Sequence, residues 1–416
     1  MAFHICFLRE AKKYARLARM NRHVRRIIVA LSVFLWVLLA PHALLYIMCP
    51  IYRFQPKKPF SGDSWYNPYR NIEGNWYKAN FHAHSRAWFG ITAGRDERGE
   101  LYEHYRRMGY DVIGLSNYQT IHKWKTDSRG FFPAYEHGYN LRKRHHLAIG
   151  AQEVVWTDYV FWQNCHHKQD LLKVLTNRTP FLVINHPALL GAFTKEDFER
   201  LTDYDAIEVL NHHRNSEELW DAALSAGRLS WMVGNDDTHD ISNPGQTCVC
   251  WTMVNAMSTG QDDIISAMKA GRMYGVEGKS GVNENALRKV EVRADSLIVE
   301  LERPAREISY ICDRGEVFRT FSHTNESKAQ LEPRNTYIRI EIQNDQSRMY
   351  LNPIVRFDGH SVPTYSAAID VLKTWVQRFS CLTILVIISV LPLGIRRIME
   401  KKRSMGKRYR DASTFS

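Results

Sequence analysis

Two histidines, His82 and His84, are the residues whose spacing most directly suggests chemistry. They end the run Asn75-Trp-Tyr-Lys-Ala-Asn-Phe-His-Ala-His, which predicts a β-strand. Residues two apart on a strand point to the same face, so the two imidazoles would lie side by side. Neutral imidazole binds zinc, iron, nickel or copper. The pair is therefore a candidate corner of a metal site, although two hydrogen-bonded core histidines would show the same spacing.

Further potential ligands recur at the ends of the predicted strands that follow. They are Asn117, Tyr118 and His122 after Asp111–Leu115, Glu153 after Leu147–Gly150, His186 after Phe181–Ile184, His212 and His213 after Ala206–Leu210, and Asp237 and His239 after Trp231–Gly234. Each alone is compatible with a solvated turn or a core histidine. Active sites are built at the carboxyl edge of such sheets, so the recurrence favours one metal centre. The chain has no Gly-x-Ser-x-Gly elbow, Walker loop or His-Glu-x-x-His motif.

The elements that must position these residues alternate between strand and helix. Strand-like and helical runs follow one another from Trp76 to Val254, which predicts an α/β domain with a parallel sheet over residues 75–285. Short alternating strands without helices follow, and predict a small all-β, sandwich-like module over 286–362. Residues 49–74 are expected to be a linker and 363–378 a connector.

Basic charge is confined to the two ends of the chain. Residues 1–26 carry eight Arg/Lys and one Glu, and residues 396–416 carry eight Arg/Lys, one Glu and one Asp. The ends thus hold +7 and +6 of the net charge of +12, and residues 27–395 sum to −1. A near-neutral body argues against a nucleic-acid partner.

Each basic end borders an apolar run, at residues 27–48 and 379–395, and both runs predict transmembrane helices. The alternatives are a signal peptide for the first run and a buried core helix for the second. By the positive-inside rule both termini would be cytoplasmic, and the main domain periplasmic or extracellular. A two-pass protein of the cell (inner) membrane is expected.

Taken together, the motifs resemble the PHP (polymerase and histidinol phosphatase) superfamily. The matching stretches are Phe-His-Ala-His-Ser at 81–85, Gly-Ala-Gln-Glu at 150–153, Ile-Asn-His-Pro at 184–187 and Asp-Asp-Thr-His-Asp at 236–240. Downstream, Asp263 to Tyr274 and the β module ending at Asn352-Pro-Ile are similar to the CehA/McbA-type metallohydrolase branch. The resemblance implies a distorted (β/α)7 barrel with up to three divalent ions at its carboxyl strand ends.

Residue by residue, the resemblance implies a set of metal ligands. His82 and His84 would bind the first ion, completed by Asp237, and Glu153 would bridge to a second ion held by His186. His239 would serve a third ion or orient a phosphate. Asp237 and His239 are also the residues expected to act in catalysis.

Two positions depart from the family pattern. Asn117-Tyr118 stands where Asp-His is usual, and Tyr159 stands where a further histidine ligand is usual. His122, His166 and His167 lie near enough in sequence to substitute. The departures leave between one and three ions, with zinc, manganese and iron all compatible.

The favoured hypothesis is a membrane-anchored, metal-dependent hydrolase, a phosphoesterase that uses metal-activated water. Its substrate would be a small-molecule or lipid-linked phosphoester. The alternative is a catalytically weakened binding or sensor module that retains a metal site.

Overall fold

The computed structural model describes residues 22–70, 72–90, 92–123, 130–362 and 364–387, together with 390 and 398. The chain divides into two compact units. Unit 1 comprises Met1–Ile51 and Asp370–Ser416, and unit 2 comprises Tyr52–Ile369. The candidate ligands all belong to unit 2.

Unit 1 contains the helix α2 (Arg22–Met48), with Pro41 inside it. Its stretch Arg26–Met48 is long and apolar enough to cross a membrane, and none of it is buried. A second helix occupies 371–387. The predicted second span, 379–395, runs beyond it into residues that are for the most part not described. Most residues of the two basic ends, 1–26 and 396–416, also lie outside the described residues.

Seven strands of unit 2 carry the candidate site and are called the barrel below. They are β3 (Asn75–Asn80), β6 (Val112–Leu115), β7 (Phe131–His137), β8 (His146–Ile149), β9 (Phe181–Ile184), β10 (Ala206–Leu210) and β11 (Trp231–Gly234). They are hydrogen-bonded neighbours in this order. The segment after β3 pairs in parallel with the segment after β11 through Ala83 and Thr238. The first and last strands therefore meet at their carboxyl ends.

Six barrel strands run parallel and β8 runs the other way. β8 pairs antiparallel with both β7 and β9, whereas β3–β6, β6–β7, β9–β10 and β10–β11 pair in parallel. The connection from β7 to β8 spans only 138–145, too short for the crossover that a parallel pair requires. This reversal decides which end of β8 reaches the site.

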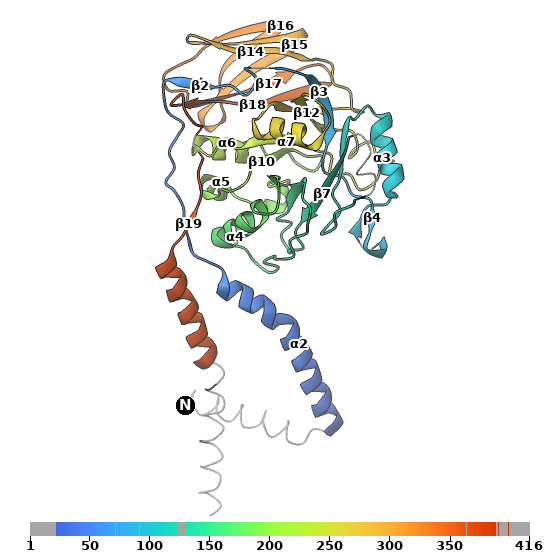
Figure 1. Ribbon diagram of the computed structural model, residues 1–416, viewed down its shortest axis with the longest axis vertical. Helices are drawn as coiled ribbons and strands as arrows, with labels where there is room; N and C mark the ends of the chain where they lie inside the picture. Colours follow the sequence, from blue (N-terminus) through green and yellow to red (C-terminus); the bar gives the residue numbers. More distant parts are fainter. Residues whose placement is uncertain are drawn as a thin grey trace, which may run out of the picture. The chain divides into compact units, whose positions relative to one another are not determined.

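Helices lie between the other barrel strands or follow them (Figure 1). They are α3 (Arg98–Arg107), α4 (Cys165–Thr176), α5 (Lys195–Arg200), α6 (Glu217–Ser225) and α7 (Gln261–Lys269). The strands β6, β9, β10 and β11 are buried along their whole length, as expected where helices cover a parallel sheet. The predicted mixed α/β architecture is confirmed.

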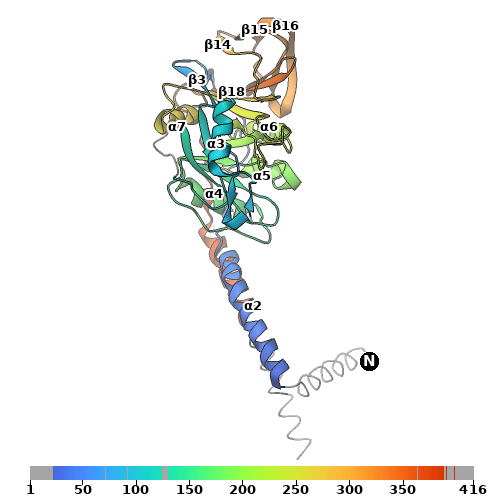
Figure 2. The same cartoon turned by 90° about the vertical axis from the view of Figure 1, so that its right-hand side faces the viewer.

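The C-terminal part of unit 2 is an antiparallel extension of the same sheet. It consists of β12 (Cys250–Ala256), β13 (Met273–Gly278), β14 (Leu287–Arg293), β15 (Ser296–Cys312), β16 (Glu316–Gln330), β17 (Tyr337–Gln343) and β18 (Ser347–Phe357). β12 pairs with β3, and β13 with β18. The strands predicted over 286–362 are therefore hydrogen-bonded to the barrel sheet within one compact unit. Figure 2 shows β14, β15 and β16 at one end of unit 2.

The remaining strands are short. β1 (Tyr52–Arg53) pairs with β19 (Ala368–Ile369), β2 (Ser64–Tyr66) with β18, and β4 (Arg86–Ala87) with β5 (Thr92–Ala93). Residues 49–74, expected to be a linker, thus contribute two strands to unit 2.

Candidate metal centre

The closure of the barrel brings His82 and His84 against Asp237. His84 donates its backbone N–H to Thr238 O at 2.9 Å, and Asp237 donates its own to His82 O at 2.9 Å. The Nε2 atoms of His82 and His84 lie 3.1 and 3.3 Å from Asp237 Oδ1. The two Nε2 atoms are 3.2 Å apart. The two imidazoles lie side by side as predicted, although β3 ends at Asn80 and both histidines follow the strand.

Glu136, at the end of β7, is the carboxylate at the centre of the cluster. Its Oε1 lies 3.3 Å from His82 Nε2, 2.9 Å from His145 Nδ1 and 3.1 Å from His186 Nε2. Its Oε2 lies 3.2 Å from His84 Nε2. The side chain is fully buried. Glu136 therefore contacts four candidate histidine ligands, and Asp237, with five imidazoles within 4 Å, is the second carboxylate around which the cluster is built.

Sequence reasoning did not find Glu136 because β7 does not resemble a strand. Its sequence Phe-Phe-Pro-Ala-Tyr-Glu-His is buried throughout and so lacks alternation, and Pro133 argues against a sheet interior. A usable signal was present. Glu136-His137 follows an apolar run, the same arrangement that marks the other strand ends.

Glu153, expected to bridge two ions, lies outside the cluster. Its side chain is exposed and pairs with Arg178. The reason is the reversal of β8, because Glu153 follows the carboxyl end of that strand and so emerges at the opposite edge of the sheet. His145, which precedes β8, reaches the site instead.

Within the described part of the chain, three groups of side chains have ligand atoms within 4.8 Å of one another, and the groups overlap. They are His82, His84, Glu136 and Asp237; Glu136, His145 and His186; and His212, His213 and Asp237. The first two groups are buried, whereas the third is partly exposed. Glu136 belongs to the first two and Asp237 to the first and third. Carboxylates shared in this way can bridge neighbouring cations.

His239 borders the first group. Its ring stacks on His84 with centroids 4.4 Å apart, and its Nε2 lies 3.5 Å from Asp237 Oδ1. Burial and the neighbouring His84 lower the pKa of His239 to about 3. Its imidazole is therefore neutral at physiological pH.

Glu208, inside β10, fixes the orientation of His82. Its Oε1 lies 2.9 Å from His82 Nδ1, and its Oε2 accepts the backbone N–H of His186 at 2.9 Å. A proton on Nδ1 directed at Glu208 leaves Nε2 to face Glu136 and Asp237. A carboxylate behind a histidine is the usual partner of a ligating imidazole.

The cluster favours the charged forms of its two carboxylates and of His82. Burial alone would raise the pKa of Glu136, yet His145 and His82 hold it well below its usual value. Burial likewise opposes ionisation of Asp237, but His82 and His84 keep its pKa far below normal. Burial would lower the pKa of His82, and the carboxylates Asp237 and Glu208 raise it well above its usual value. Metal binding would displace such protons.

Two buried oxygens of the cluster accept no hydrogen bond. They are Glu136 Oε2 and Asp237 Oδ1, although imidazole Nε2 atoms approach both within 3.3 Å. Buried polar atoms without partners are rare and call for an explanation. Coordination to a cation would satisfy both, and imidazole with carboxylate is a donor set suited to zinc, iron or manganese. The residues therefore fit a divalent metal.

The backbone at two candidate ligands is strained. His186 and Asp237 have φ angles of 26° and 53°, a region that costs a non-glycine residue about 1–3 kcal/mol. The folded barrel holds them there, as is common at functional sites.

The residues that depart from the PHP sequence pattern differ in where they lie relative to the cluster. Tyr118 lies in the site, where its ring stacks on His84 with centroids 4.7 Å apart, and burial raises its pKa. Asn117 accepts the Ser85 N–H at 2.9 Å. Tyr159 instead donates to Asp170 at 2.7 Å.

None of the three substitute histidines belongs to the ligand groups. His122 lies beside Asn117 Nδ2, while His166 Nδ1 accepts the Tyr52 N–H and His167 Nδ1 accepts the Asn164 N–H.

Comparison with solved structures finds a similarity in fold. The chain is similar to a two-domain protein from Bacteroides vulgatus that contains a predicted PHP-like metal-dependent phosphoesterase. The alignment has a TM-score of 0.40 and 14% sequence identity, and covers 72% of this chain and 99% of that chain. No protein-family model matches this chain, and no curated protein matches it.

Proposed function

We propose that this protein is a metal-dependent hydrolase that acts on phosphoesters. The observation that carries the proposal is the pair of shared, buried carboxylates, Glu136 and Asp237, each reached by several imidazoles. Assembling so many ionisable groups away from water is costly unless a cation joins them. A purely structural cluster would have its hydrogen bonds complete.

The residues of the three overlapping groups would hold the metal. When bound there, a divalent ion would activate a water molecule and stabilise charge on phosphate oxygens. Glu208 keeps His82 oriented. His239 has a side chain 26% exposed, and its neutral imidazole can hydrogen-bond a substrate or water at the edge of the cluster; its pKa of about 3 makes it a weak base at neutral pH.

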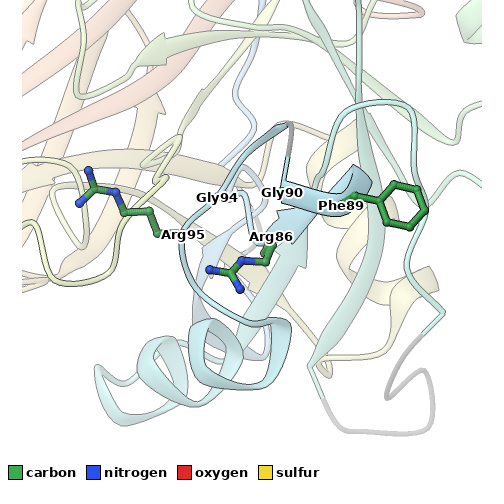
Figure 3. A pocket seen from close by; sticks show the side chains of 5 residues that line it. All are labelled: Arg86, Phe89, Gly90, Gly94 and Arg95. Carbon is green, nitrogen blue, oxygen red and sulfur yellow. The ribbon is translucent and has the colours of Figure 1, made fainter.

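A basic pocket beside the cluster supports an anionic substrate. It has a volume of about 460 Å³ and is lined by Arg86, Phe89, Gly90, Gly94 and Arg95 (Figure 3). Arg95 donates its backbone N–H to His239 O at 2.9 Å and its side chain contacts Asp240 at 2.8 Å. Guanidinium groups bind phosphate oxygens in a forked geometry. Arg86 likewise pairs with Glu97 at 3.5 Å, so a phosphate between this pocket and the cluster would take the place of the carboxylate partners of both guanidinium groups.

Membrane anchoring is part of the proposal. The support is the length and apolar composition of Arg26–Met48 and the basic residues before it. A second span at 379–395, cytoplasmic termini and a main domain outside the cytoplasm remain our proposals from charge and hydropathy.

The deciding experiment combines metal analysis with turnover. We expect the purified full chain to retain stoichiometric zinc, manganese or iron, and to hydrolyse members of a phosphomonoester and phosphodiester panel. A chelator should abolish the activity and one of these metals should restore it. Absence of bound metal together with activity unaffected by the double variant His82→Ala/Asp237→Ala would refute the proposal.

One observation favours a second candidate, a metal-holding binding module without turnover. Tyr118 covers one face of His84, and a neutral phenol takes a place where the family has a charged pair. In that case the metal content would be stoichiometric while no phosphoester is turned over, and ligand binding would depend on the metal.

A further inference from the structure

Among the residues that the structure describes, six large apolar side chains besides Tyr139 are exposed on three loops of unit 2. They are Trp88, Phe89, Leu141, Trp156, Phe161 and Trp162, and we call this set the aromatic rim. Phe89 is 103% exposed, Leu141 71% and Trp162 60%. Single exposed apolar residues are ordinary, but a contiguous group on a soluble surface marks a site of interaction.

Direct contacts join the three loops into one surface. The rings of Trp88 and Trp156 lie 6.3 Å apart. The backbone N–H of Leu141 donates to Val160 O at 3.0 Å, and the hydroxyl of Tyr139 donates to Trp156 O at 2.7 Å. The loop at 138–145 is therefore fastened to the loop at 155–163, which in turn meets the β4–β5 hairpin.

Packing within the fold does not explain the exposure of the hairpin tip. Trp88 and Phe89 have φ angles of 50° and 57°, a left-handed conformation that non-glycine residues rarely adopt. The fold thus accepts an unfavourable turn that projects an aromatic ring into solvent. Figure 3 shows Phe89 directed away from the two arginines of the pocket.

The rim borders the metal centre. Trp88 Nε1 donates to Tyr118 O at 2.8 Å, and the Tyr118 ring stacks on His84. Only one residue therefore separates a rim tryptophan from a candidate metal ligand. Whatever covers the rim therefore lies close to the centre.

The rim also borders the two points where the chain leaves unit 2. Tyr52 and Ile369 are register partners in the β1–β19 pair. The hydroxyl of Tyr52 donates to Asp170 Oδ1 at 2.8 Å, and that of Tyr159, in the rim loop, donates to Asp170 Oδ2 at 2.7 Å. In Figure 1, β4, α4 and β19 all lie toward the end of unit 2 that is away from β14–β16.

These contacts point to one occupant, a lipid bilayer. The apolar stretch Arg26–Met48 ends four residues before Tyr52, a length of chain that extends at most about 14 Å. Tryptophan is enriched at the boundary between lipid and water, and Phe and Leu occur with it on apolar faces that are buried in that interface. Arg142 and Lys143, exposed next to Leu141, add the positive charge that favours anionic lipids.

We propose that the aromatic rim rests in the interface of an anionic bilayer, so that the metal centre opens toward lipid headgroups. The second half of this statement rests on the proposed function and makes a membrane phospholipid the substrate class. The proposal that the rim docks on a bilayer does not depend on the protein having hydrolase activity.

Photo-cross-linking of the full chain in nanodiscs of phosphatidylcholine and phosphatidylglycerol tests the docking surface. The photoreactive p-benzoylphenylalanine replaces Phe161 in the rim or, as control, Val317, which is 54% exposed on β16. We expect at least a tenfold excess of lipid adducts at position 161 over position 317. Equal adducts at both positions, or adducts at 161 only to a co-purifying protein, would overturn the proposal in favour of a solvated surface or a protein partner.

Activity provides a separate measurement. The triple variant Trp156→Gln/Phe161→Gln/Trp162→Gln should lose about tenfold in turnover of a phospholipid in vesicles, with turnover of a water-soluble phosphoester unchanged. Equal losses on both substrates would overturn the lipid assignment. If the wild type turns over neither substrate while the cross-link to lipid forms, the proposed function fails and the docking surface stands.

Discussion

Two clusters of buried charge in unit 2 differ in how completely their hydrogen bonds are satisfied. Between α6 and β17, Arg339 donates from Nε and Nη2 to the two carboxylate oxygens of Asp221 at 2.7 and 2.8 Å, and Tyr337 donates to the same carboxylate at 2.9 Å. At the strand ends, Glu136 Oε2 and Asp237 Oδ1 accept no hydrogen bond.

By this criterion the Asp221–Arg339 pair is structural, whereas the cluster around Glu136 and Asp237 is a candidate binding site. A satisfied buried pair holds two elements together and needs nothing further. A cluster with several imidazoles around incomplete carboxylates is stable only with protons or a cation among them. Burial of charge therefore does not identify the site, whereas buried carboxylate oxygens without a hydrogen bond do, since among the described residues they occur only at Glu136 and Asp237.

The largest expected effect sharpens this comparison at Glu136. Glu136→Gln removes the carboxylate shared by two ligand groups, and we expect phosphoesterase activity to fall at least ~10³-fold, or about 4 kcal/mol, with loss of bound metal. Glu153→Gln is the matched control, since its side chain is exposed, and it should stay within about twofold of wild type. Equal effects of the two substitutions would show that the buried cluster is not the metal centre.

The second prediction concerns the satisfied pair. Asp221→Ala leaves Arg339 buried with one carboxylate neighbour, Glu341, and should lower the free energy of unfolding by about 3 kcal/mol, while metal content is unchanged. Urea denaturation of the full chain in detergent micelles measures it. Glu332→Gln removes an exposed partner of Arg334 and should leave the midpoint unmoved. Metal loss in Asp221→Ala at full folding would contradict the distinction.

The third prediction addresses the support behind the cluster. Glu208→Gln keeps the shape of the side chain but weakens the hydrogen bond to His82 Nδ1, and we expect metal affinity to drop about 10- to 100-fold. Competition with a fluorescent chelator measures the affinity, and circular dichroism verifies that the fold is retained. Unchanged affinity would mean that Glu208 does not orient His82.

The smallest expected effect is a pH dependence far from the cluster. Burial lowers the pKa of His167 to about 4, and its ring accepts the N–H of Asn164 at the start of α4. The unfolded chain binds a proton below its usual pKa of about 6.5 while the folded chain does not. The contribution of neutral His167 to the free energy of unfolding is therefore fully present above pH 6.5 and is lost as the pH falls toward 4.

Allowing for screening by solvent, we expect a loss of about 1.5 kcal/mol over this range. His167→Gln should reduce the dependence of the melting temperature on pH by this amount, and His360→Gln, an exposed control, should leave it as it is. A slope that is the same in all three proteins would show that other groups govern it.

Much of the site was predictable from local sequence. The spacing of His82 and His84 on a strand, and the positions of His186, Asp237 and His239 after predicted strands, place these residues where the structure has them. The reason is that apolar runs of four or five residues followed by polar ones define a buried strand and its end without reference to other segments. The alternation of strand and helix similarly predicted the α/β architecture.

Tertiary structure decided the rest. The sequence around Leu147 predicts a strand but carries no sign of its direction, because direction depends on which neighbour the strand pairs with. The reversal of β8 sends Glu153 to the far edge and brings His145 to the site. β7 gains its strand conformation from pairing on both sides, despite Pro133, and so delivers Glu136. Local residue types thus determined which ligand groups were available, and long-range strand pairing determined that Glu136, and not Glu153, lies in the candidate metal centre.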